Sequence, residues 1–160
     1  MSDTTPERLA AELNDFMHAA PDVEAASVAS REGVTLASAL PEDTDIDGIG
    51  TLSAELLVLA EQAATHFDRG NVRQLFVEGD RGFVFLLAAG DQAVLTAVTA
   101  RTASLGPVVH EMRRSADALA GILAAPDTGE ALARKLTDLG LGDEAEASMF
   151  DFDASDASRG

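Results

Sequence analysis

The stretch Gly48-Ile49-Gly50-Thr51-Leu52-Ser53 is the only glycine-rich start of a helix in the chain, and glycines in such a turn can cradle a phosphate. The pattern is incomplete, because Ser53 stands where a third glycine would be and no strand precedes it. The acidic residues just before it would also repel a phosphate; these are Asp43, Asp45 and Asp47. We therefore interpret the stretch as a flexible helix start and not as a nucleotide site.

Other residues that could do chemistry are scattered. The three histidines, His18, His66 and His110, fall on three separate predicted helices at no metal-ligand spacing. The chain has no Cys or Tyr and neither a G-x-S-x-G nor an H-E-x-x-H motif, so no nucleophile–base pair can be assembled. Asp80 and Asp91 are explained by the preference of Asp for turns. The sequence predicts a protein that is not an enzyme and has no cofactor or metal.

The charge balance limits the partners. Twenty-eight acidic residues face eleven basic ones, for a net charge of −17, which makes nucleic acid and anionic membranes poor partners. Abundant Asp with a single Lys favours a halophile, whose salt screens self-repulsion. The first residues lack the features of a signal peptide, and no apolar run approaches the ~20 residues that span a bilayer. We expect no direct membrane insertion and a cytoplasmic location.

The pattern of elements indicates an α+β domain. A helix is predicted over Pro6 to Ala19, and a hairpin over Val23 to Ser30 and Val34 to Leu40. A second helix runs from about Ile49 to Phe67. Three strands joined by two short turns then form an antiparallel meander, because a parallel pair needs a longer crossover. These strands are Val72 to Glu78, Phe83 to Ala89 and Val94 to Thr99, and an amphipathic helix from Leu105 to Leu123 closes the domain.

The second helix is apolar all round. At 100° per residue one stripe is apolar, and we expect it to face the sheet; it consists of Ile49, Leu52, Leu56, Ala60, Ala63 and Phe67. Leu57 and Val58 are then expected to point outward, and a helix apolar on both sides is normally buried on both sides. The second cover is predicted to be another protein chain, with the C-terminal segment of the same chain as the alternative.

The segment 126–160 is an acidic C-terminal extension. A short helix is predicted at about 129–140 and disorder beyond it. Within the extension, Phe150 and Phe152 form either a docking motif or an incidental apolar pair.

Three stretches, taken with the element order, carry a family resemblance: SVASREGVTLAS at 27–38, FVEGDRGFVFLLAAGDQAVLTAV at 76–98 and LGPVVHEMRRSADALAGIL at 105–123. In these the chain resembles the Roadblock/LC7 family, and most closely its prokaryotic MglB-type and conservon members. The resemblance covers about residues 7–124, so 1–125 is expected to be the domain. It implies the order α-β-β-α-β-β-β-α and a five-stranded antiparallel sheet, with the long helix on one face and two helices on the other.

The resemblance also implies a function. Family members form homodimers or heterodimers through the long helix and the third strand, and prokaryotic members act with small Ras-like GTPases, in the best-known bacterial case without supplying an arginine finger. The expected role is a homodimeric GTPase regulator or platform; the alternatives are a scaffold or sensory adaptor indifferent to nucleotide state, and a small-molecule-binding domain or enzyme. The residues implied in the dimer interface are Ala54, Leu57, Val58, Glu61, Val72, Arg73 and Leu75. Those implied at the rim of a GTPase-docking surface are Thr51, Glu55, Gln62 and Thr65.

Overall fold

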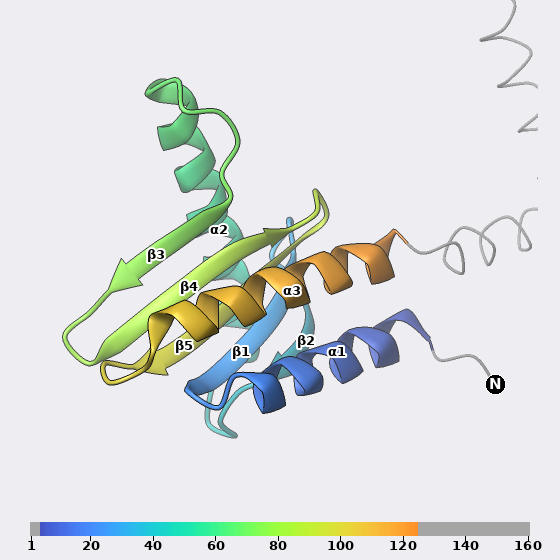
Figure 1. The fold of residues 1–160 in the computed structure, drawn as a ribbon. Coiled ribbons are helices and arrows are strands. Elements are labelled where there is room, and N and C mark those ends of the chain that lie inside the picture. Colours follow the sequence, from blue (N-terminus) through green and yellow to red (C-terminus); the bar gives the residue numbers. More distant parts are fainter. Residues whose placement is uncertain (1–3, 125–160) are drawn as a thin grey trace, which may run out of the picture. The chain divides into compact units, whose positions relative to one another are not determined.

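The computed structural model describes residues 4–124, which form an α+β fold with the predicted element order (Figure 1). The elements are α1 (Thr5–Ala19), β1 (Val23–Ser30), β2 (Thr35–Ala39), α2 (Ile46–His66), β3 (Gln74–Glu78), β4 (Gly82–Ala89), β5 (Ala93–Ala100) and α3 (Leu105–Leu123). The five strands form one antiparallel sheet in the order β2-β1-β5-β4-β3. The predicted helix at 129–140 lies outside the described residues.

Helices α1 and α3 lie side by side on one face of the sheet (Figure 1) and bury the larger core. The side chains at its centre come from both helices and from alternate positions of the strands. They include Phe16, Val28, Phe85, Leu95, Met112 and Leu119, each no more than 2% exposed.

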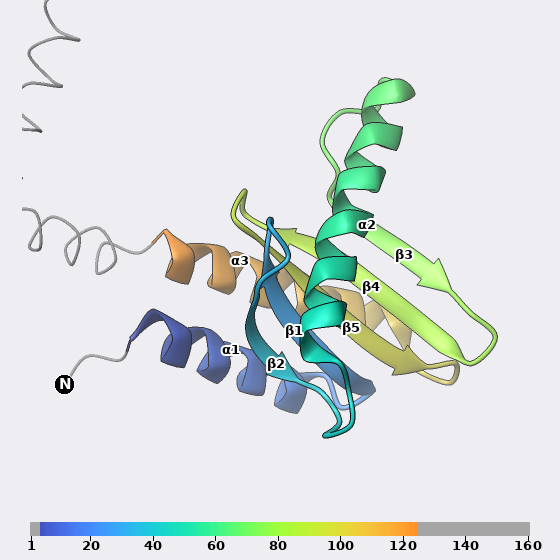
Figure 2. The same ribbon diagram turned by 180° about the vertical axis from the view of Figure 1, so that it is seen from behind.

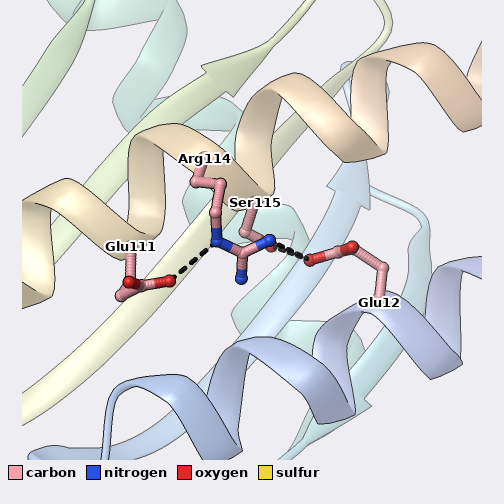
Figure 3. Close-up of polar contacts among 4 residues, drawn as sticks. All are labelled: Glu12, Glu111, Arg114 and Ser115. Atoms are coloured by element: carbon pink, nitrogen blue, oxygen red, sulfur yellow. Dashed lines mark hydrogen bonds and ion pairs between the residues drawn. The ribbon is translucent and has the colours of Figure 1, made fainter.

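A polar clamp joins α1 to α3 over this core (Figure 3). The Ser115 hydroxyl, fully buried, donates to Glu12 Oε2 at 2.9 Å. Arg114 donates to Glu111 at 2.8 Å, and its guanidinium lies 3.9 Å from Glu12. The hydrogen bond to Glu111 raises the pKa of Arg114 above its ordinary value. The clamp fixes the two helices side by side.

Helix α2 covers the opposite face alone (Figure 2). It packs on β1 and β2, less on β5 and β4, and its C-terminal turns extend past the sheet. The core on this side is small, with Ala29, Leu57, Leu86 and Val94 fully buried. One helix therefore leaves much of this face, toward β4 and β3, uncovered among the described residues.

Helix α2 begins three residues earlier than predicted. Asp45 is its N-cap, and the Asp45 carboxylate accepts a hydrogen bond from the Gly48 N–H at 3.1 Å. The two glycines are thus helical. A Cβ at position 50 would meet Thr35 Oγ1 and lie 2.9 Å from the Gly33 carbonyl oxygen. Glycine at position 50 allows α2 to approach the β1–β2 hairpin closely. This packing explains the glycine at the start of the helix without a bound phosphate.

Strand β3 begins two residues later than predicted. Gln74 pairs with Leu87, and the chain before it leaves the sheet. The reason is the turn after α2, where Asp68 (φ 55°) and Gly70 (φ 84°) both adopt left-handed conformations. Val72 consequently packs, half-buried, against the small α2-side core and not in the ladder.

Candidate interaction surface on helix α2 and strand β3

Most of the exposed large hydrophobic side chains of the described chain belong to two elements, α2 and β3. Seven of the eight belong to α2, to its C-cap or to β3; Val34 is the exception. The seven are Ile46, Leu52, Val58, Leu59, Phe67, Phe76 and Val77. Scattered apolar residues are normal on a protein surface, but a contiguous group marks an interaction site. We call this group the α2–β3 surface.

In the structure α2 is rotated partway about its axis from the predicted orientation. The residues that face the sheet are Gly50, Ser53, Ala54 and Leu57, and the last two are 6% and 1% exposed. The prediction that Ala54 and Leu57 point outward was wrong. The physical reason is space: close packing on the hairpin needs small side chains, so the helix turns its glycine, serine and alanine inward.

The larger residues of the predicted inward stripe lie instead toward the uncovered part of the sheet. Leu52 is 51% exposed, Leu56 is half-buried against the α2-side core, and Phe67 is 73% exposed. With Leu59 and Ala63 they recur every three or four residues, which is the spacing of a seam between two packed helices. This side of α2 has no cover among the described residues.

Strand β3 continues the same surface. Within residues 4–124 it is an edge strand that pairs only with β4, so one row of its backbone N–H and C=O groups has no sheet partner there. Leu75 and Val77 lie on the α2 side of the sheet, whereas Phe76 stacks against Phe83 and Phe85 on the other. An apolar, unprotected edge is a template for pairing with another strand.

The predicted rim residues Thr51, Glu55, Gln62 and Thr65 are all exposed and follow one line along α2. Thr51 and Glu55, together with Leu59, border an open groove between α2 and the β1–β2 turn, and Gln62 and Thr65 border a second one. Val58, 44% exposed, borders both grooves and therefore joins them.

Glu61, a predicted dimer contact, has a partner within its own chain. Arg31 in the β1–β2 turn donates from Nη1 to Glu61 Oε2 at 2.7 Å. The Arg31 backbone N–H donates to the Gln92 carbonyl oxygen at 3.1 Å, so this residue links α2 to both turns at one end of the sheet. Sequence reasoning missed it, since nothing local connects positions 31 and 61.

Arg73 lies just before β3, exposed, in a groove that also includes Arg113 and Asp117 of α3. Arg113 donates from Nη2 to the Gln74 side-chain oxygen at 3.1 Å. This is a small basic region beside the β3 edge of an acidic protein.

Chemistry at the surface is limited. Within residues 4–124 no group of three His, Asp or Glu side chains is arranged to hold a metal ion. In the same residues, none of the helices is both long and apolar enough to cross a bilayer. What the surface offers is apolar area, a free strand edge and polar rims.

Comparisons with known proteins agree with this fold. The Roadblock/LC7 domain matches residues 9–99. The protein MJ0310 of Methanocaldococcus jannaschii is 27% identical over 95 residues, which are 59% of this chain and 82% of MJ0310. An MglB structure with a tetrameric arrangement is 25% identical with a TM-score of 0.69, over 76% of this chain and 92% of that one. A Roadblock/LC7 domain from Streptomyces avermitilis has 23% identity and a TM-score of 0.68, over 78% and 100% of the two chains.

Proposed function

The chain belongs to the Roadblock/LC7 family, and from this premise we propose that it is a non-catalytic, homodimeric regulator or platform for a small Ras-like GTPase. The α2–β3 surface is the observation that carries the proposal. It combines an apolar helix seam with a free sheet edge. Apolar side chains are expected at both places if a second chain buries them. The similar MglB structure has a tetrameric arrangement, which makes assembly of this chain a natural expectation.

In the proposed dimer β3 pairs with β3 of a second copy, and the two α2 helices pack along their seams. The observed orientation of α2 changes the interface expected from sequence. Leu52, Leu56 and Leu59 replace Ala54 and Leu57 as the helix contacts, because the latter are buried against their own sheet. Leu75 and Val77 contribute from the sheet, and Arg73 and Val72 flank the paired strands.

The GTPase-docking surface is proposed to be the line of rim residues on α2. Two α2 helices side by side would place two such lines on one surface of the dimer. None of the four rim residues carries a positive charge, so none of them would insert a cation among the GTPase phosphates. It would act by binding and reshaping the switch regions of the GTPase.

The acidic surface fits a halophile's cytoplasm, and we propose that location. We propose residues 1–125 as the domain, because α3 continues to Leu123, beyond the family match that ends at residue 99.

The test is size exclusion with light scattering in about 2 M KCl, where charge repulsion is screened. The expected mass is twice the 16.6 kDa of one chain. The dimer is then mixed with a candidate Ras-like GTPase carrying GDP or a non-hydrolysable GTP analogue, and co-elution only with the analogue supports the regulator. A dimer that binds both forms equally, or neither, points to the nucleotide-independent scaffold.

Two variants separate the two surfaces. Ala63→Asp puts a charge into the apolar seam, away from both grooves, and is expected to halve the mass, because burying an unpaired carboxylate is costly. Glu55→Arg is expected to leave the dimer intact and abolish co-elution with the GTPase. A dimeric Ala63→Asp protein would contradict the proposed seam.

A further inference from the structure

A cavity of about 130 Å³ lies between the N-terminal half of α2 and the sheet. Its walls are apolar side chains of α2, β1, β4 and β5, together with Leu40. Leu52, 51% exposed, is one of the lining residues and lies at its mouth, toward the uncovered part of the sheet. The cavity thus has both an enclosed interior and an opening.

Three hydroxyl-bearing residues from three elements line this apolar space. Ser27 and Thr96 are directly opposite each other on β1 and β5, and Ser53 comes down from α2. All three are at least 94% buried. Thr96 Oγ1 donates to Ser53 Oγ at 2.8 Å, which satisfies that pair.

Ser27 is different. It is 1% exposed, and its Oγ has no hydrogen-bond partner within the described part of the chain. Native proteins rarely leave a buried hydroxyl unsatisfied, because the group has lost its water and gained nothing in return. A partner that enters the cavity would satisfy it.

Water alone fits the space poorly. A water molecule occupies about 30 Å³ and needs two to four polar partners, so several waters would leave most of their hydrogen bonds unmade against these walls. No charged side chain within residues 4–124 lines the cavity, so a carboxylate or phosphate would lose its hydration without compensation. An apolar cavity of about 150 Å³ holds a benzene ring.

We propose that this cavity binds a small uncharged organic molecule, about the size of a benzene ring, that carries one hydroxyl or carbonyl group. The apolar part of the ligand fills the space under α2, and its polar group hydrogen-bonds Ser27 Oγ. The cavity shares Leu52 and Leu56 with the proposed helix seam, but the hydrogen bond to Ser27 does not depend on the GTPase proposal.

The test uses phenol as the probe. Benzene, the same ring without the hydroxyl group, is the control ligand. Amide resonances of the full-length protein are followed by NMR up to about 10 mM ligand, since a ligand this small is expected to bind with a Kd on the order of 1 mM. Saturable shifts centred on Ser27, Ser53 and Thr96 are expected. Phenol is expected to bind about fivefold more tightly than benzene, as befits one added hydrogen bond.

Ser27→Ala is expected to remove that fivefold preference while benzene still binds. Ser38→Ala is the matched control, because Ser38 is exposed on β2 directly opposite Ser27 and does not line the cavity. Its preference for phenol is expected to be unchanged. The proposal is overturned if the folded wild type shows no saturable shifts at the three residues, or if Ser27→Ala keeps the preference.

Discussion

Leu57→Ala tests the orientation of α2, on which the proposed interface depends. Leu57 is 1% exposed and lies in the small core beneath the helix, with Ala29, Leu86 and Val94. Removing three buried carbons costs about 2.4 kcal/mol at roughly 0.8 kcal/mol each. The empty space adds to this, because the Arg31–Glu61 ion pair and the close hairpin contact hold α2 in place. We expect a total loss of about 3 kcal/mol, within the range found for buried leucines.

The matched control is Leu59→Ala, the same substitution two positions later. Leu59 is 60% exposed, so the free energy of unfolding of a single chain should change by less than about 0.5 kcal/mol. Any further loss for this variant should disappear on dilution, because it comes from weaker association.

The assay is urea unfolding followed by circular dichroism at two protein concentrations. Leu57→Ala should lose stability equally at both concentrations. Thermal unfolding followed by the same signal should show a melting temperature lower by roughly 10 °C. If instead Leu59→Ala carries the large, concentration-independent loss, then Leu59 and not Leu57 faces the sheet. In that case Leu59 could not be part of the seam.

Three further substitutions have defined outcomes. Gly50→Ala should destabilise the protein by about 1–3 kcal/mol, since the new methyl group meets Thr35. Gly121→Ala should stabilise it by up to about 1 kcal/mol, because nothing lies within 4 Å of the new methyl group. Urea unfolding measures both changes, and equal effects would contradict the close packing of α2. Glu61→Gln should cost less than about 1 kcal/mol, because its pair with Arg31 is partly exposed at 40% and 25%. That cost should shrink when unfolding is repeated in concentrated KCl, and a salt-independent loss would show that the pair does not act through charge.

Most of the fold follows from local patterns in the sequence. The short turns Gly79–Gly82 and Gly90–Asp91 require antiparallel neighbours, and the strands on either side of them pair as predicted. The amphipathic stripe of α3 is also confirmed, with Val108, Met112 and Leu119 buried. Helix α3 has one apolar side and one polar side, so the pattern alone determines its orientation.

The site was less predictable because its key contacts join distant positions. Ser27, Ser53 and Thr96 meet only after the sheet and α2 have formed, and each is an unremarkable residue in its own segment. The start of α2 was misplaced for a related reason. Of the two glycines that suggested a loose loop, Gly50 is instead required by close contact with Thr35 and Gly33, more than a dozen residues earlier in the chain.

The rotation of α2 away from its predicted orientation shows why hydrophobicity alone does not identify the face of this helix that packs on the sheet. A helix held close to a hairpin must present small residues to it, so Gly50, Ser53 and Ala54 are buried although they are not the most apolar residues available. The large side chains are then displaced to the side where there is room. On a helix covered by its own chain alone such residues would be a liability. Here they lie beside the free edge of β3, and that coincidence of two unprotected apolar features is what a second chain would cover.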